Sequence, residues 1–211
     1  MAGAQARDTI PAMSPIELRD FTGPSVRPWL DDLARLRIAV FREWPYLYDG
    51  DVAYEKPYLA AYAASPRSLF VLAFLDGKVV GASTGVPLAD EGETFQRPFL
   101  ERGIAPQSVF YFGESVLLPE HRGRGVGGRF FDHREAYARS LSGIRRCAFC
   151  AVERPADHPR RPAGFVPLDA FWRRRGYTKR PDLTTRLAWR ELGDSDETPK
   201  PMTFWTRPLD R

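Results

Sequence analysis

The sequence predicts a single α+β domain built on a mixed, mostly antiparallel twisted sheet with helices on both faces. Three observations carry this prediction. The chain has 211 residues, enough for one sizeable hydrophobic core. The dipeptide Asp76-Gly77 separates two apolar runs of strand length, which is the pattern of an antiparallel hairpin. Residues 108–152 have the pattern of a strand, a helix and a strand, which predicts one central parallel pair joined by a right-handed crossover.

The N-terminal half supplies the first elements. Residues 16–21 alternate apolar and polar side chains, as expected of a strand. Pro28 stands where the first turn of a helix tolerates proline, and apolar residues then recur at helical spacing up to Phe41. The aromatic and acidic stretch 44–54 has no periodicity and predicts a loop. The elements expected next are a short helix, the two hairpin strands and a weakly helical stretch, over residues 55–64, 68–75, 78–86 and 91–102.

The C-terminal half begins with an expected strand over residues 108–118, ending at Pro119. An amphipathic helix over residues 125–141 follows, with Gly143 suited to its C-terminal cap. The later elements are a short apolar strand, a proline-rich loop, a helix closed by glycine and two antiparallel strands, over residues 147–152, 154–167, 168–175, 183–189 and 202–207. We expect residues 1–14 to form a flexible tail and residues 15–211 to form the folded domain.

Composition narrows the classes of partner. The net charge is +4, and only four of the 31 basic residues are lysine. Such a field suits nucleic acid, an anionic membrane surface or a phosphate-bearing small molecule. The arginine clusters lack the interleaved aromatics of a nucleic-acid platform, and no apolar run approaches the roughly 20 residues of a membrane span. We therefore expect no nucleic-acid and no membrane partner, and a cytoplasmic location, because no secretory signal is evident.

We also expect no metal site. Cys147 and Cys150 have the spacing of a metal-binding pair, but residues three apart on a strand face opposite sides. Two cysteines are too few for a disulfide scaffold, so buried thiols are expected. The histidines have no partner at ligand spacing: His121, His133 and His158.

The most informative segment is residues 117–128, where a strand passes through a glycine-rich turn directly into a helix. The N–H groups of a first helical turn lack intrahelical partners, and the helix dipole favours an anion there. Glycines let a ligand approach the backbone closely. Arg122, Arg124 and Arg129 add positive charge. The segment therefore predicts a site for a phosphate-bearing ligand.

One pattern in this segment is the dinucleotide fingerprint Gly-X-Gly-X-X-Gly, at Gly123, Gly125 and Gly128. Its context departs from a Rossmann unit, because four residues separate the strand from the first glycine and an antiparallel hairpin precedes. Glu153 could mimic the ribose-binding acid, but it lies about 30 residues past the first glycine instead of about 20. A nicotinamide-linked oxidoreductase is therefore the second-ranked enzyme.

The other pattern is Arg-X-X-Gly-X-Gly, at Arg122, Gly125 and Gly127, and through it the chain resembles the GNAT superfamily of acyl-CoA-dependent N-acetyltransferases. The similarity extends over residues 16–207, with residues 170–177 similar to a later helix motif of the family. The resemblance implies acetyl-CoA as cosubstrate, a parallel strand pair that splays apart, and an acyl-CoA N-acyltransferase domain over residues 15–211. It implies direct transfer of acetyl, in a ternary complex, to a primary amine of a small cationic molecule or a peptide. A homodimer is compatible with it.

The resemblance also implies roles for individual residues. Backbone amides of the glycine turn would hold the CoA diphosphate, the preceding strand would pair with the pantetheine arm, and an amide on that strand would stabilise the oxyanion. The implied cofactor-binding residues are Val116, Leu117, Leu118, Arg122, Gly123, Arg124, Gly125, Val126, Gly127, Gly128 and Trp172.

The resemblance points to Glu114 as the catalytic base. An alkylamine with a pKa near 10 must lose a proton at pH 7, at a cost of about 4 kcal/mol, and the family often uses an acidic residue of this strand. An ion pair with an arginine is the competing interpretation of Glu114. The family's general-acid tyrosine falls at Trp172, whose indole cannot donate that proton, and Tyr111 and Tyr177 are weaker substitutes. A catalytically weak CoA-binding regulatory protein is therefore the alternative of a different class.

The acceptor pocket is expected in the loop after the first helix. Aromatic faces beside carboxylates suit a cationic amine, although loop aromatics also commonly cover a core. The candidate substrate-binding residues are Trp44, Tyr46, Tyr48, Asp49 and Tyr111.

Overall fold

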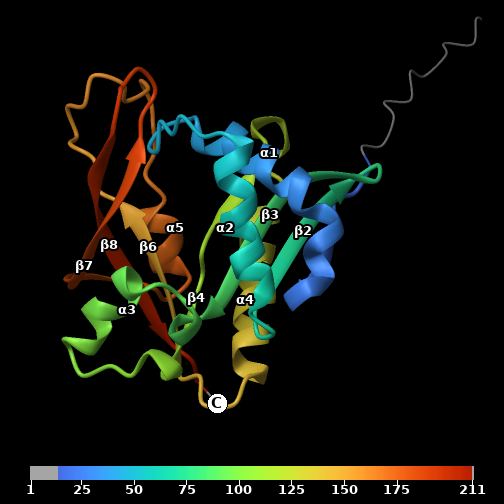
Figure 1. Cartoon of the computed structure of the whole chain (residues 1–211), viewed down its shortest axis with the longest axis vertical. Coiled ribbons are helices and arrows are strands. Elements are labelled where there is room, and N and C mark those ends of the chain that lie inside the picture. The colour runs from blue at the N-terminus through green and yellow to red at the C-terminus, as the bar shows by residue number, and fades with distance from the viewer. Residues whose placement is uncertain (1–13, 211) are drawn as a thin grey trace, which may run out of the picture.

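The structure is a computed structural model that describes residues 14–210 (Figure 1). The predicted tail lies, except for Ser14, outside the described residues. The strands are β1 Glu17–Thr22, β2 Leu69–Leu75, β3 Lys78–Pro87, β4 Val109–Tyr111, β5 Ser115–Leu117, β6 Arg146–Val152, β7 Thr178–Arg190 and β8 Glu197–Pro208. The α-helices are α1 Leu30–Phe41, α2 Val52–Ala64, α3 Glu93–Leu100, α4 Val126–Ser140 and α5 Asp169–Arg174, and a 3-10 segment, Gly23–Trp29, leads into α1.

The sheet has the order β1-β2-β3-β4-β6-β8-β7, and β5 adds a second pairing to β3. Every pairing is antiparallel except β4 with β6, so the predicted mixed sheet with one central parallel pair is confirmed. The turn at Asp76-Gly77 joins β2 to β3 as predicted. This topology is not the doubly wound parallel sheet that a dinucleotide fingerprint needs, so the oxidoreductase alternative is wrong.

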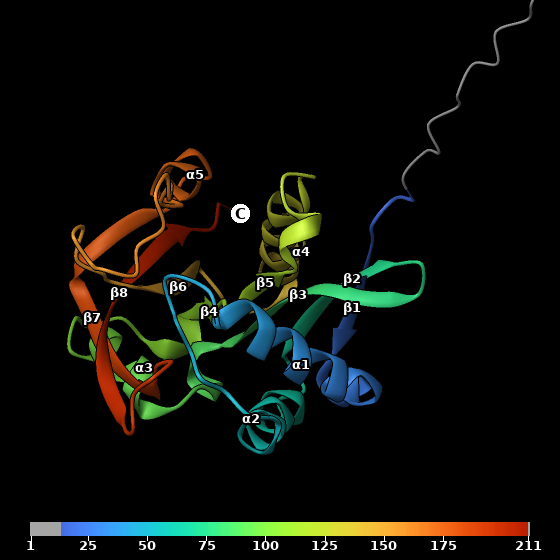
Figure 2. The ribbon, with the colours of Figure 1, turned by 90° about the horizontal axis from the view of Figure 1, so that it is seen from above.

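Helices cover both faces of the sheet (Figure 2). On one face α4 and α5 pack over a cluster that includes Phe130 and Phe131. On the other face α1 and α2 pack over β2 and β3, and α3 covers the C-terminal strands. Strand β2 contributes Val71 to the first cluster and Leu72 to the second, which explains why its sequence is apolar without alternation.

The predicted strand 108–118 is not continuous, because residues 112–114 interrupt it. The N–H of Gly113 donates to the Thr84 carbonyl, while the N–H of Glu114 turns to the Thr84 hydroxyl at 3.3 Å. A Cβ on residue 113 would lie only 2.7 Å from the Thr84 and Tyr62 side-chain oxygens, so this close approach requires glycine. The interruption divides the strand into β4 and β5.

Other boundaries differ by a few residues. Helix α2 begins at Val52 rather than at residue 55, because Asp51 caps it by accepting a hydrogen bond from the Tyr54 N–H at 3.0 Å. Strands β7 and β8 extend well beyond the predicted ranges. They pair with each other from Thr178 opposite Thr206 to Arg190 opposite Glu197. Within residues 14–210, no helix has the length and apolar character that a membrane span requires.

Candidate active site

The parallel pair opens beyond its third residue. Its last hydrogen bond runs from the Phe112 N–H to the Ala148 carbonyl at 2.8 Å. After that point β5 stays paired with β3, while β6 continues along β8. The edges of β5 and β6 that face each other therefore have no partner strand, and the predicted splayed pair is confirmed.

The register of β5 defines which main-chain groups face this opening. The Leu118 N–H donates to the Val80 carbonyl at 3.0 Å, so it is used by β3. Successive residues of an antiparallel strand point their N–H groups to opposite edges, so the amides of Ser115 and Leu117 face the opening. A bound pantetheine would find its pairing groups at these two residues and not at Leu118.

The glycine turn lies at the start of α4. Gly125 is the N-cap of this helix with φ 75°, and Gly123 has the same φ, a left-handed conformation that glycine tolerates and other residues resist. No described side chain caps the helix, and a Cβ on Gly123, Gly125 or Gly127 would meet nothing within 4 Å. The space beside these glycines is therefore open within residues 14–210, and the N–H groups of the first turn have no side-chain cap there. This donor set fits a diphosphate.

The three arginines beside the turn all have protein partners. Arg122 donates to the Leu117 carbonyl at 3.1 Å and forms an ion pair with Glu43 at 2.8 Å. Arg124 and Arg129 each donate, at 2.9 Å, to a main-chain carbonyl of the segment before β1. Their charge lies near the helix end, but a phosphate would have to compete with these partners for direct contact.

Glu114 is the last residue of the interruption and is 7% exposed. Its Oε2 forms an ion pair with the guanidinium of Arg37 on α1, whose Nε also donates to the Glu55 carboxylate at 2.5 Å. Burial opposes the charge of Arg37, but the two carboxylates raise its pKa above the ordinary value. Glu114 Oε1 has no hydrogen-bond partner among the described residues. One oxygen of the carboxylate is thus held by Arg37, while the other is buried without a hydrogen-bond partner in the described chain.

A second, half-buried carboxyl lies near Glu114. Glu91 accepts a hydrogen bond from the Tyr62 hydroxyl, beside the interruption at Gly113. Burial raises the pKa of Glu91 to about 7, and the charge of Glu114 acts in the same direction. Glu91 is therefore a titratable group of the site in the neutral pH range.

This shift predicts a pH dependence of stability. From its ordinary pKa of 4.5 up to about 7, Glu91 keeps its proton in the folded chain and has lost it in the unfolded chain. The free energy of unfolding therefore falls as pH rises through this window, by up to about 1.4 kcal/mol per unit, and Glu91→Gln removes that contribution. Urea unfolding from pH 5 to 8 measures it, with Glu101→Gln, at a 68% exposed side chain, as control. Parallel pH curves for wild type and Glu91→Gln contradict the prediction.

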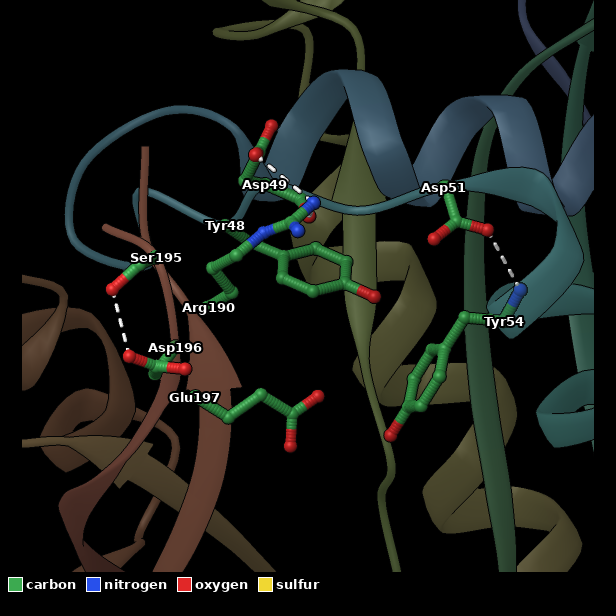
Figure 3. Close-up of a pocket in the computed structure, with 8 residues that line it drawn as sticks. All are labelled: Tyr48, Asp49, Asp51, Tyr54, Arg190, Ser195, Asp196 and Glu197. Atoms are coloured by element: carbon green, nitrogen blue, oxygen red, sulfur yellow. Dashed lines mark hydrogen bonds and ion pairs between the residues drawn. The ribbon is translucent and has the colours of Figure 1, made fainter. Parts of the chain in front are cut away.

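An acidic pocket of about 320 Å³ lies between the α1–α2 loop and the β7–β8 turn (Figure 3). Asp49 is paired with Arg190 at 3.2 Å, and Asp51 caps α2. Asp196 and Glu197 have no basic side chain within ion-pair distance in residues 14–210. The pocket is lined by Tyr48, Asp49, Asp51, Tyr54, Arg190, Ser195, Asp196 and Glu197. Four carboxylates against one guanidinium make it attractive to cations.

Tyr48 brings this pocket next to the buried ion pairs. Burial and the neighbouring Glu55 carboxylate raise the pKa of Tyr48, which keeps its hydroxyl protonated. Because the Glu55 carboxylate that acts on Tyr48 is ion-paired with Arg37, and Arg37 with Glu114, the pocket adjoins the ion-pair network that holds the candidate base.

The structure brings Tyr48 and Asp49 of the predicted acceptor residues into this pocket, but not the other three. Trp44 packs against the rings of His158 and Phe165. Tyr46 packs against Phe41 with ring centroids 4.7 Å apart, and Tyr111 lies next to Cys150, with 3.1 Å between hydroxyl and sulfur. Trp172 packs between Phe149 and Trp205, with centroids about 5 Å from each, and the Tyr177 hydroxyl donates to Glu135.

The sequence did not identify Arg37, Glu55 or Glu91 as members of the site. A signal existed for Arg37, because it occupies the apolar stripe of its helix together with Leu33 and Phe41, where a charge needs a buried partner. Nothing comparable marks Glu91. In the described chain, no group of three His, Cys, Asp or Glu side chains is placed to hold a metal.

Comparisons with known proteins agree with this geometry. A model of the acetyltransferase (GNAT) family matches residues 33–177. No curated protein matches the chain.

Three solved structures share the fold. Ribosomal-protein-alanine N-acetyltransferase from Brucella melitensis is 16% identical with a TM-score of 0.59, covering 92% of this chain and 99% of its own. The polyamine N-acetyltransferase of Drosophila melanogaster is 15% identical with a TM-score of 0.58, covering 92% and 100%. The yncA protein of Salmonella typhimurium, solved with its cofactor acetyl-CoA, is 13% identical with a TM-score of 0.56, covering 94% and 96%.

Proposed function

Because this chain belongs to the acetyltransferase (GNAT) family, whose acetyl donor is acetyl-CoA, we propose that it acetylates the primary amine of a small cationic molecule. The observation that carries the proposal is the juxtaposition of three features. An uncapped helix N-terminus follows β5 at the opening between β5 and β6, a buried carboxylate lies directly before β5, and its ion-pair network adjoins an acidic pocket through Glu55 and Tyr48.

In this proposal, different residues bind acetyl-CoA and accept the proton of the amine. The amides at Gly125, Val126 and Gly127 bind the diphosphate, and the edge of β5 at Leu117 holds the pantetheine arm. Glu114 takes a proton from the ammonium form of the amine, directly or through one water. The nitrogen lone pair then forms the N–C bond as the C–S bond breaks. The nitrogen releases its second proton and the thiolate takes one up, both by exchange with water, and Glu114 returns its proton to solvent as the N-acetylated amine and free CoA leave.

Glu114→Gln is expected to lower kcat by roughly 10²- to 10⁴-fold, because the amide cannot accept the amine proton. The KM for acetyl-CoA stays within about threefold, since Glu114 does not reach the helix N-terminus. Initial rates of thiol release across pH 6 to 9 measure both. Glu120→Gln, at an exposed carboxylate beside the glycine turn, is the matched control. A pH–rate profile unchanged by Glu114→Gln removes this residue as the base.

The acceptor is tested with a panel of amines. A dicationic amine is expected to have a lower KM than a monocationic amine of equal length, because the second ammonium reaches the unpaired carboxylates of Asp196 and Glu197. Replacing both by Asn and Gln raises the KM of the dication by about tenfold, at up to about 1 kcal/mol per exposed pair, with that of the monocation unchanged. A structurally similar protein is a polyamine N-acetyltransferase, which supports this choice.

Two results contradict the proposal. Equal KM values for both amines in wild type and variant would remove the acidic pocket as the acceptor site. Tight binding of acetyl-CoA without thiol release for any small amine or peptide would favour the CoA-binding regulatory protein instead.

A further inference from the structure

Arg134 of α4 is a buried cation without a carboxylate partner among the described residues. Its side chain is 1% exposed, and the guanidinium stacks 4.2 Å from the ring centroid of Phe112 and 4.8 Å from that of Phe131. Burial lowers its pKa to about 10, which still leaves it charged at neutral pH. Burying a charge in such surroundings is costly unless its hydrogen bonds are satisfied.

Those hydrogen bonds converge on the interruption between β4 and β5. Nη1 donates to the Glu114 carbonyl at 3.0 Å and to the Thr84 carbonyl at 3.4 Å, and Nη2 donates to the Ser115 hydroxyl at 2.8 Å. Nε donates to the carbonyl of Phe130, one turn earlier in α4. Two of the four bonds therefore hold the segment where the parallel pair opens, and a third reaches Thr84 of β3, to which this segment is hydrogen-bonded.

The orientation of one peptide unit connects this cation to the opening. The Glu114 carbonyl also accepts a hydrogen bond from the Thr84 N–H at 3.1 Å, so it points toward β3 and Arg134. In a trans peptide the N–H points away from the carbonyl, so the N–H of Ser115 points into the opening. The pairing of β5 with β3 gives the same direction. The Leu118 N–H points to β3, and because N–H groups alternate along a strand, the N–H of Ser115, three residues earlier, points to the other edge.

We propose that Arg134 is a positioning residue for acetyl transfer, which acts through the peptide between Glu114 and Ser115. By donating to the Glu114 carbonyl it fixes the interruption and polarises this peptide, so that the Ser115 N–H donates more strongly to the thioester carbonyl oxygen as negative charge develops there. The inference rests on the proposed function. A charge-assisted bond at one end of a peptide strengthens the donor at the other, and a single oxyanion donor is worth roughly 10²- to 10³-fold in kcat.

The first test needs neither acetyl-CoA nor an acceptor. The amide ¹H and ¹⁵N shifts of Ser115 are measured by NMR in free wild type, Arg134→Lys, Arg134→Met and Ser115→Ala, each checked for folding by thermal melting. Arg134→Met is expected to move the amide proton of residue 115 upfield, and Arg134→Lys to move it less. Ser115→Ala removes the hydroxyl that accepts from Arg134 but keeps the hydrogen bond from Arg134 to the Glu114 carbonyl. Apart from the local effect of the substitution, its residue 115 amide proton is therefore expected to keep the wild-type shift.

The second test uses bound acetyl-CoA labelled with ¹³C at the thioester carbonyl. Infrared difference spectra are expected to show the carbonyl stretch lowered on binding to wild type and less lowered in Arg134→Met. In parallel, kcat falls by about 10- to 100-fold, with the affinity for CoA within threefold of wild type. A folded Arg134→Met protein with a wild-type Ser115 amide shift, carbonyl stretch and kcat overturns the proposal.

The outcomes separate this inference from the proposed function. If no amine is acetylated by wild type, the proposed function fails, and the NMR shift still decides whether Arg134 polarises the peptide. If Arg134→Met does not fold, Arg134→Lys carries the test. A purely structural role lowers its melting temperature without changing the Ser115 shift or kcat, and that result rejects the proposal.

Discussion

Gly127→Asp is expected to abolish acetyl-CoA binding while slightly stabilising the fold. Residue 127 is the second position of α4, and a Cβ there meets nothing within 4 Å, so the side chain fits. Aspartate is better than glycine in a helix by only about 0.3 kcal/mol, and a carboxylate in the first turn adds about 0.3–1 kcal/mol. The same carboxylate would occupy the anion site and repel the diphosphate. Near a protein surface, two unit charges 4 Å apart interact by about 4 kcal/mol.

The predicted loss of acetyl-CoA affinity is 100-fold or more, which is about 2.7 kcal/mol. Isothermal titration calorimetry measures it, and thermal melting of the free protein measures the stability. Gly127→Asn is the matched control, because it has the same size without the charge, and it should lose much less affinity. Acetyl-pantetheine, which lacks the diphosphate, should bind wild type and Gly127→Asp equally. Wild-type affinity of Gly127→Asp for acetyl-CoA would mean that the diphosphate is held elsewhere.

The parts of the fold that depend on local sequence were the parts that could be predicted. The hairpin follows from Asp76-Gly77 between two apolar runs, and the glycine turn at the start of α4 follows from glycines ahead of an amphipathic pattern. Both depend on residues next to one another in the chain, as backbone conformation and helix capping do. The same holds for the opposite orientations of Cys147, which is buried in the core under α4, and Cys150, which packs on the other face.

The interruption at residues 112–114 could not be predicted in this way. It depends on Thr84, which accepts and donates hydrogen bonds around Gly113, and on Tyr62 from a helix on the sheet face. These groups lie about 30 and 50 residues away in the sequence, so the pattern of residues 108–118 alone indicates an unbroken strand. The splaying at the candidate active site is therefore a consequence of tertiary packing.

The surroundings of Glu114 could not be predicted from the sequence either. The candidate residue could be chosen from its place before the glycine turn, but its partners come from α1 and α2. A sequence gives the face of a helix on which Arg37 lies and not the carboxylates that meet it there. Trp44 and Tyr46 were expected in the acceptor pocket because of their position in the loop. Tertiary contacts, which the sequence does not reveal, instead place their rings against other aromatic rings.

Arg37→Met is expected to destabilise the protein by about 3–5 kcal/mol, because it leaves two buried carboxylates without their cation. Glu55 is fully buried and the side chain of Glu114 is 3% exposed, so water cannot replace the guanidinium at either. This is a large part of the roughly 5–15 kcal/mol that stabilises a typical domain. Urea unfolding at pH 7 gives the value. Arg35→Met, two residues earlier on α1 and paired only with exposed Asp32, should cost less than about 1 kcal/mol.

A double variant tests whether the stability lost in Arg37→Met comes from unpaired buried charge. If the loss arises from unpaired buried carboxylates, then neutralising one of them in Arg37→Met, Glu55→Gln should recover part of it. No recovery in the double variant would assign the effect of Arg37 to the packing of its alkyl chain and its contact with the Tyr58 ring instead. In that case Glu114 would not depend on Arg37, and its proposed role as a base would have to be explained by its other surroundings.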